Sequence, residues 1–263
     1  MVILEKNGPV AILTLNRPER HNSLVPEFLQ AILDALAAVE ANTGASTALS
    51  TGISVLILQA NGRSFSTGGD ALGFVEHADD IQAYARQIVG LLNKTILAMI
   101  DLRVPVVTAV HGIVTGGSLG FILGSDVVLV APETSFAPFY SEVGPSPDGG
   151  WAVLLPLLIG QKRAAEVLYL NLGIDAETAV AWGLANRVIP GQKIHAAAQQ
   201  IAASIVDKKQ GSIQHTKRLL NLDRDEIARR LDAELEHFAA QISTEEGIGG
   251  FRDFLEELQR KKK

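Results

Sequence analysis

The first 190 residues of the chain alternate short apolar runs with longer stretches in which apolar residues recur every three or four positions. Short runs rich in Val, Ile and Leu predict strands, whereas the longer spacing predicts amphipathic helices. Strands are expected at residues 2–6, 10–15, 55–59, 106–110 and 127–130, and helices at residues 26–40, 78–102, 117–124 and 149–159. This order predicts an α/β fold with a parallel sheet, in which ligand-binding loops follow the carboxyl ends of the strands.

From about residue 191 onward the apolar spacing is helical throughout, with helices expected at residues 194–206, 213–222, 224–242 and 250–261. No charged run or low-complexity block separates this part from the rest. Residues 1–190 are therefore predicted to form an α/β core, and residues 191–263 an all-helical extension of it. Helices that extend past a core often pack on a neighbouring subunit, which predicts a role in oligomerisation. Residues 41–51, rich in Thr, Ser, Gly and Ala, predict a surface connection.

Composition narrows the classes of function. The 263 residues include no cysteine, which excludes disulfides, thiolate catalysis and cysteine-ligated zinc, and no spacing of His, Asp and Glu indicates another metal site. A net charge of −6 disfavours nucleic-acid binding, which depends on basic side chains that neutralise phosphates. No apolar run reaches the length of a membrane span, and the N-terminus lacks the features of a signal peptide. We therefore expect a cytoplasmic protein, or an organelle-matrix protein in its mature form, that binds neither nucleic acid nor a membrane.

Three glycine-containing stretches are candidates for the chemistry of the chain: FSTGGD (65–70), HGIVTGGSLG (111–120) and GPSPDGG (144–150). The first two follow predicted strands, and each places paired glycines where a tight turn can bring backbone N–H groups close to a ligand. Two such loops can direct two N–H groups at one oxygen atom, which is the geometry of an oxyanion hole. The third stretch places one acidic side chain, Asp148, among apolar neighbours, which disfavour its charge and make it a stronger base.

Across nearly its whole length the chain resembles the crotonase (enoyl-CoA hydratase/isomerase) superfamily. The resemblance rests on LNRPERHNSL (15–24), FSTGGD (65–70), VPVVTAVHGIVTGGSLGFILGSDVVLVA (104–131) and AVAWGLANRVI (179–189), which are highly specific together. It implies a spiral of ββα repeats with an all-helical C-terminal extension, assembled as a homotrimer or a dimer of trimers. It also implies binding of acyl-CoA thioesters, with no cofactor besides the coenzyme A that the substrate itself carries.

The resemblance implies roles for particular residues. The backbone amides of Gly69 and Gly117 would form the oxyanion hole. The residues expected to bind coenzyme A or the acyl group are Arg20, His21, Ser23, Leu24, Ser66, Gly68, Asp70, Ala71, Leu72, Gly116, Phe139 and Tyr140. Among them, Asp70 is expected to hold its loop in place rather than to take part in chemistry.

Departures from the family pattern bear on the reaction. Hydratases of the superfamily carry two catalytic glutamates, at the positions of Gly120 and Tyr140 in this chain, so hydration by the usual route is disfavoured. The PDGG segment instead resembles the branch of Δ3,Δ2-enoyl-CoA isomerases and the ring-opening isomerase of phenylacetate breakdown, which carry a single acid at the position of Asp148. Dehalogenases of the superfamily also place an Asp near here, but their supporting His and Trp are not matched.

Each candidate side chain also has a structural interpretation. Asp148 precedes the predicted helix at 149–159 and could be its N-cap, although the resemblance favours a catalytic base. Glu142 is a second candidate base, for which a solvent-facing position is preferred. Tyr140 could shape the acyl pocket, donate a hydrogen bond or pack as an aromatic.

The leading hypothesis is an acyl-CoA isomerase that shifts a double bond, with a carboxylate as proton carrier and an oxyanion hole for the thioester enolate. One alternative is a CoA-ester or C–C bond hydrolase in which Asp148 activates water. Another is a non-catalytic protein that binds acyl-CoA. The sequence does not indicate which acyl group is bound.

Overall fold

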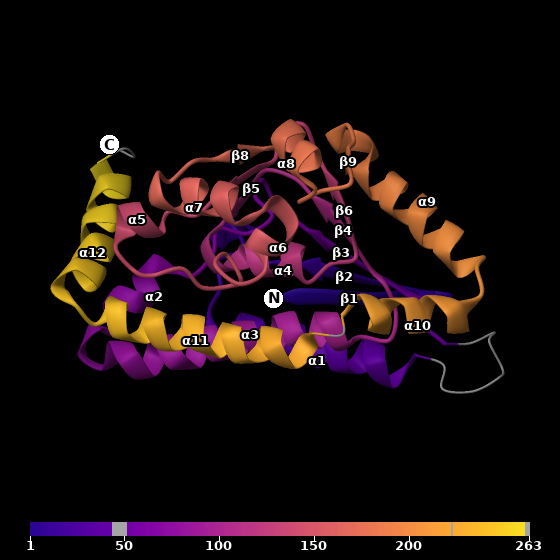
Figure 1. The fold of residues 1–263 in the computed structure, drawn as a ribbon, viewed down its shortest axis with the longest axis horizontal. Helices are drawn as coiled ribbons and strands as arrows, with labels where there is room; N and C mark the ends of the chain where they lie inside the picture. The colour runs from indigo at the N-terminus through magenta and orange to yellow at the C-terminus, as the bar shows by residue number, and fades with distance from the viewer. Residues whose placement is uncertain (44–51, 222, 261–263) are drawn as a thin grey trace.

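A computed structural model describes residues 1–43, 52–221 and 223–260 of the chain. From residue 44 on, the predicted connection at 41–51 lies outside the described residues. The described part is a mixed α/β structure in which a sheet lies between layers of helices (Figure 1). None of its helices combines the length and the apolar character that crossing a membrane requires.

The main sheet has six strands in the order β1-β2-β3-β4-β6-β9. They are β1 (Val2–Asn7), β2 (Val10–Leu15), β3 (Val55–Ala60), β4 (Val106–Val110), β6 (Val127–Val130) and β9 (Arg187–Val188). β1 pairs with β2 as an antiparallel hairpin, and every later pairing in this sheet is parallel. A second sheet contains β5 (Ile113–Thr115), β7 (Ser135–Ala137) and β8 (Ile174–Asp175). The five strands predicted from sequence are confirmed, and the parallel order of β2, β3, β4 and β6 places the carboxyl ends of these four at one edge.

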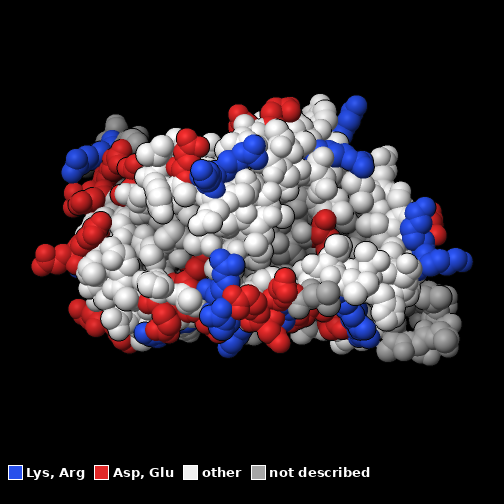
Figure 2. All heavy atoms as spheres, in the orientation of Figure 1, with Lys and Arg blue, Asp and Glu red and all other residues white. Residues whose placement is uncertain are grey.

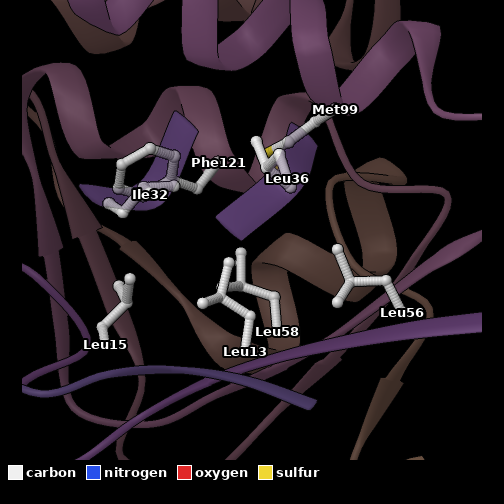
Figure 3. A pocket seen from close by; sticks show the side chains of 8 residues that line it. All are labelled: Leu13, Leu15, Ile32, Leu36, Leu56, Leu58, Met99 and Phe121. Atoms are coloured by element: carbon white, nitrogen blue, oxygen red, sulfur yellow. The ribbon is translucent and has the colours of Figure 1, made fainter. Parts of the chain in front are cut away.

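Helices cover both faces of the main sheet at its centre, because the strands there, such as β3 and β4, are apolar on both sides. In β3, Leu56 and Leu58 face α1 (Pro26–Ala41) and α3 (Ile81–Asp101), whereas Val55 and Ile57 face α9 (Ile194–Val206). Figure 3 shows side chains on the face of the sheet that packs against α1 and α3, where the gap between them has no room for a water molecule. The side chains drawn there are Leu13, Leu15, Ile32, Leu36, Leu56, Leu58, Met99 and Phe121. Burying each of them contributes about 1.5–3 kcal/mol.

The helices of the C-terminal extension pack on the core of their own chain. Besides α9 they are α10 (Gln210–Leu220), α11 (Arg224–Ile242) and α12 (Glu245–Arg260). α11 runs along α3, and α12 packs against α2 (Ala71–Glu76) and α5 (Tyr140–Val143) (Figure 1). The rings of Phe74 on α2 and Phe251 on α12 stack with centroids 4.9 Å apart. Through α2, which follows the FSTGGD loop, the extension therefore packs next to one of the glycine loops. Its role in oligomerisation stays a prediction.

Several predicted boundaries need correction. The helix predicted at 149–159 is wrong over its first half, because Gly149 and Gly150 adopt φ of +64° and +88°, which a right-handed helix does not accommodate. Only α6 (Leu155–Ile159) is helical there. The helix predicted at 117–124 is a 3-10 turn, η3 (Gly116–Ser118), followed by α4 (Leu119–Leu123), and the one predicted at 250–261 begins earlier, at Glu245. The 3-10 turn η2 (Ala78–Asp80) likewise precedes α3.

Short elements went unrecognised in the sequence because they contain too few residues for a periodic pattern. Besides α2, α5 and the three-residue and two-residue strands, they are α7 (Gln161–Tyr169), α8 (Ala176–Trp182) and the 3-10 turns η1 (Pro18–Arg20) and η4 (Gly191–Lys193). On the face shown in Figure 2, Lys and Arg side chains lie scattered among Asp and Glu, and acidic side chains gather at the end that carries α12. This face offers no broad basic surface for a nucleic acid.

Candidate active site

Three segments that the sequence singled out lie side by side. The N–H of Leu24 donates to the carbonyl oxygen of Gly68 (2.7 Å), and the N–H of Asp70 donates to the carbonyl oxygen of Leu24 (3.0 Å). The N–H of Thr115 donates to the carbonyl oxygen of Ser66 (3.2 Å). Gly68 has φ of +71°, and a Cβ on it would lie 2.6 Å from the oxygen of Thr115. Only glycine allows the two glycine-rich loops to approach this closely.

The backbone amides of Gly69 and Gly117 are both available as donors. Gly69 lies half-buried beside the loop of Leu24, and Gly117 lies buried in the turn that precedes α4. In the part of the chain that the structure describes, neither N–H donates to a backbone or side-chain acceptor. A donor without an internal partner can bind a ligand oxygen without first breaking a bond within the protein.

The carboxyl group of Asp148 lies against the second of these glycines. A Cβ on Gly117 would meet the Oδ1 and Oδ2 atoms of Asp148 at 3.0 and 3.1 Å. The residue is only 7% exposed, and burial raises the pKa of its carboxyl group to about 6, against the lowering effect of a hydrogen bond from Tyr140. The N-cap interpretation of Asp148 is wrong, because α6 begins at Leu155 and has no side-chain cap.

Tyr140 lies beside Asp148 as a hydrogen-bond donor. Its hydroxyl group is 2.5 Å from Oδ1 of Asp148 and 3.1 Å from the carbonyl oxygen of the same residue. Burial and the neighbouring carboxylate raise the pKa of Tyr140 well above its usual value, so the phenol keeps its proton. Of the possibilities considered for Tyr140, hydrogen-bond donation is confirmed. Glu142 is exposed, which confirms its solvent-facing position.

Asp70 holds the loops together, as expected. Its carboxylate accepts hydrogen bonds from the Leu72 N–H (3.2 Å), from Ser23 Oγ (3.0 Å) and from Arg20 Nη2 (2.9 Å). Burial alone would raise the pKa of Asp70, but the hydrogen bonds from Arg20 and Ser23 and the charges of Arg20 and Arg17 outweigh it and lower that pKa. The carboxylate therefore stays charged. It joins the loop that contains Arg20 and Ser23 to the start of α2.

The remaining predicted binding residues lie around the same loops. Ser66 is buried and donates to the carbonyl oxygen of Asn22 (2.7 Å), His21 and Ala71 are half-buried, and Leu72 and Phe139 are exposed. Gly116 lies next to Tyr140, whose hydroxyl oxygen is 3.9 Å from the place of a Cβ on that glycine. The structure thus brings the predicted residues to one region, while their contacts with coenzyme A stay predictions.

Sequence reasoning missed two side chains that hold the site. The indole N–H of Trp151 donates to the carbonyl oxygen of Gly116 (2.7 Å). The carboxyl group of Glu234, on α11, accepts the N–H groups of Gly150 and Ala152, each at 2.8 Å. No local signal reveals the second contact, because Glu234 follows Gly150 by 84 positions and resembles any acidic residue of an amphipathic helix.

The position of the first hydratase glutamate is closed in this chain. A Cβ on Gly120 would lie 2.4 Å from Cδ1 of Ile96 and 3.0 Å from the carbonyl oxygen of Gly149. A glutamate there would displace either the core side chain or the turn that carries Asp148. Among the described residues, no group of three or more His, Asp or Glu side chains is placed to hold a metal ion.

A groove opens beside Tyr140, between the loop after α5 and the helices α11 and α12. Its volume is about 540 Å³. It is lined by Tyr140, Ser141, Gly144, Pro145, Ser146, His237, Ala240, Gln241, Thr244 and Glu246. The region therefore combines backbone donors, the buried carboxyl group of Asp148 and a space large enough for a small group.

Comparison with known proteins identifies the lineage. A sequence model of the enoyl-CoA hydratase/isomerase family matches residues 5–262. The chain belongs to the enoyl-CoA hydratase/isomerase family. Members of this family act on acyl-CoA thioesters, in agreement with the resemblance noted in the sequence, and the crotonase-type fold expected from it is confirmed.

Some members of the family are named hydratases and others isomerases. The chain is 31% identical over 242 residues to a protein of Mycobacterium bovis named as a probable enoyl-CoA hydratase, covering 89% of this chain and 82% of that protein. It is 28% identical to the 1,2-epoxyphenylacetyl-CoA isomerase of Escherichia coli over 87% of this chain and 85% of that protein. The crystal structure of an enoyl-CoA hydratase/isomerase from Mycobacterium paratuberculosis superposes with a TM-score of 0.85, at 25% identity, over 96% of this chain and 97% of the other. Family membership alone therefore does not choose between the two reactions.

Proposed function

We propose that this protein is an acyl-CoA isomerase that shifts a carbon–carbon double bond, converting a Δ3 enoyl-CoA, or a related ring-derived CoA ester, to the Δ2 form. The observation that carries the proposal is the buried carboxyl group of Asp148, which lies against Gly117 and accepts a hydrogen bond from Tyr140. An isomerisation needs one group that takes a proton from one carbon and returns it to another.

In this mechanism, the thioester oxygen accepts hydrogen bonds from the N–H groups of Gly69 and Gly117. Asp148 takes a proton from C2, and the electron pair moves to the oxygen to give a dienolate. The two amides stabilise its negative charge, each contributing roughly 3 kcal/mol in comparable sites. Asp148 then returns the proton to C4, so the double bond moves from C3–C4 to C2–C3 and the carboxylate is regenerated. A pKa of about 6 keeps Asp148 ionised at neutral pH and makes it a stronger base than a solvated Asp.

Two features weigh against hydration of the double bond. Water addition in this family uses two acids, and here the first position is Gly120, closed by Ile96, while the second is Tyr140. The phenol of Tyr140 donates to Asp148 and keeps its proton, so it supports the carboxylate rather than acting as a second base. These features favour a one-carboxylate reaction.

We place the acyl group of the substrate in the groove beside Tyr140. The groove adjoins the aromatic ring that contacts Asp148, and α11 and α12 form its far wall. A chain that enters there would present its first carbons to Asp148 while the thioester oxygen lies at Gly69 and Gly117.

Product analysis tests the reaction type. The purified protein is incubated separately with a 3-enoyl-CoA, a 2-enoyl-CoA and a saturated acyl-CoA, and the products are separated by chromatography. The proposal predicts 2-enoyl-CoA from the first substrate, with no 3-hydroxyacyl-CoA and no free coenzyme A. Formation of the hydroxy compound would establish a hydratase, and release of free coenzyme A would establish a hydrolase. Tight binding of all three compounds without any product would establish a non-catalytic acyl-CoA-binding protein.

A further inference from the structure

Glu234 is a buried acid whose two oxygens are both used by the turn that follows Asp148. It is 6% exposed on α11. Its Oε2 accepts the N–H of Gly150 and its Oε1 accepts the N–H of Ala152, each at 2.8 Å. Burying an acid costs stability unless its oxygens are satisfied, and here the partners are two amides of a single turn, separated by Trp151. The carboxyl group therefore acts as a brace between α11 and the turn.

Hydrogen bonds within the turn converge on one carbonyl oxygen, that of Gly150, which accepts the N–H groups of Val153, Leu154 and Leu155 at 3.2, 2.7 and 3.0 Å. Gly149 and Gly150 both have positive φ, and no side chain caps the helix that follows. Gly149 packs so closely on Gly117 that a Cβ on it would lie 2.4 Å from the carbonyl oxygen of Gly117. Because the turn touches the glycine that carries one proposed oxyanion donor, a displacement of the turn would separate Asp148 from Gly117.

Glu234 and Asp148 lie close enough for the charge of Asp148 to affect the pKa of Glu234. Burial and, to a smaller extent, the charge of Asp148 raise the pKa of Glu234 to about 8, against the backbone hydrogen bonds that lower it. The titratable groups that face Glu234 from the elements packed against it are Asp148, on the turn, and Tyr140, on α5. Its neighbours on α11, Asp232, Glu236 and His237, are exposed. Asp148 and Glu234 therefore lose their protons in separate steps, with Asp148 ionising first.

We infer that Glu234 is a positioning residue, which holds the Gly149–Ala152 turn so that the carboxyl group of Asp148 stays against Gly117. The assignment rests on the proposed function, in which Asp148 carries the proton. Glu234 itself does not touch the reacting atoms in this scheme. It connects the C-terminal helices to the site, which gives α11 a part in the geometry of the reaction.

The test compares Glu234→Gln with the matched control Asp232→Asn, which changes an exposed acid on the same helix. Gln keeps the size of the side chain, but its NH₂ group faces one of the two amides, so one of the two hydrogen bonds is lost. Steady-state kinetics with 3-enoyl-CoA are expected to give a kcat lowered between about 10- and 100-fold, because small misplacements of a reacting group have effects of this size. The KM and the Kd for a saturated acyl-CoA are expected to stay within about twofold of wild type, and Asp232→Asn to match wild type in every respect.

A role in folding alone would reduce the amount of folded protein without separating kcat from KM, so the folded fraction is measured by circular dichroism. If Glu234→Gln does not fold, Glu234→Asp takes its place, since it retains the carboxylate at a shorter reach and is expected to lower kcat while KM stays the same. A folded variant of either kind with wild-type kcat would overturn the inference.

A readout without turnover separates this inference from the proposed function. In protein labelled with ¹³C at the aspartate carboxyl groups, the Asp148 resonance is expected to titrate near pH 6, with a second step near pH 8 from Glu234. The second step should be absent in folded Glu234→Gln, which has no carboxylate at this position. If wild type does not isomerise 3-enoyl-CoA, but Glu234→Gln shifts the Asp148 resonance below pH 8 and Asp232→Asn does not, the proposed function fails and the brace stands. If wild type is active, and the folded Glu234 variants keep both the wild-type kcat and the wild-type Asp148 resonance below pH 8, the brace fails and the function stands.

Discussion

Replacing Asp148 by Asn should stabilise the protein at neutral and alkaline pH, although it should abolish turnover. The folded-state pKa of Asp148 is about 6, whereas an Asp in the unfolded chain has a pKa of about 3.9. Because the folded state binds its proton more tightly, stability falls as pH rises between these values and stays low above them. A difference of about two pH units, at about 1.4 kcal/mol each, costs about 3 kcal/mol above pH 7. Asn is neutral at every pH and can still accept the hydrogen bond of Tyr140, so it avoids this cost.

Urea unfolding, followed by circular dichroism at pH values from 4 to 8, measures the effect. The free energy of unfolding of Asp148→Asn minus that of wild type should increase by about 2.4 kcal/mol from pH 4 to pH 8, because the unfolded-state Asp is already about half ionised at pH 4. Asp70→Asn is the matched control with the opposite sign, because the pKa of Asp70 is lowered in the folded state. Its carboxylate contributes stability above the unfolded pKa that is lost as pH falls below it, so this variant should be less stable at pH 7. A pH-independent difference for Asp148→Asn would refute the argument that this group is a buried base.

Three further substitutions test other parts of the account. Tyr140→Phe removes a hydrogen bond to the charged form of Asp148, so the acid limb of kcat/KM should move up by about one to two pH units; an unmoved limb would show that the bond does not act on the base. Lys217→Met removes a buried ammonium group that donates to three oxygens near the end of α3, and urea unfolding should show a loss of about 3–5 kcal/mol. In the same urea experiment, Gly149→Ala should lower the free energy of unfolding by at least about 2 kcal/mol more than Gly160→Ala. Both glycines have positive φ, but only at Gly149 would the new Cβ clash with a backbone oxygen.

The sheet and the longer helices could be predicted because their patterns are local. β3 presents apolar side chains to both faces, and its sequence contains the uninterrupted apolar run that a doubly covered parallel strand requires. The same holds for α1, whose buried residues recur at helical spacing. The glycine loops were recognisable for a similar reason, since a pair of glycines after an apolar run marks a tight turn at the end of a strand. Their alignment across three segments then follows from the parallel order of the sheet.

The turn that carries Asp148 could not be predicted in this way. Its sequence ends in an apolar run that resembles a helix, and the left-handed conformation of Gly149 and Gly150 interrupts that helix. The turn owes its form to distant contacts with Glu234 on α11 and with the carbonyl oxygen of Gly116, reached by Trp151. No spacing along the chain encodes such contacts, so the sequence located the catalytic candidate but not what holds it.

Proton exchange in deuterium oxide tests the central claim most directly. Wild type and Asp148→Asn are each incubated with 3-enoyl-CoA, and deuterium incorporation and the position of the double bond are followed by NMR and mass spectrometry. The account predicts that wild type exchanges protons at C2 and C4 and forms 2-enoyl-CoA, while Asp148→Asn binds the thioester with a similar Kd and does neither. Exchange and isomerisation by Asp148→Asn at the wild-type rate would contradict it.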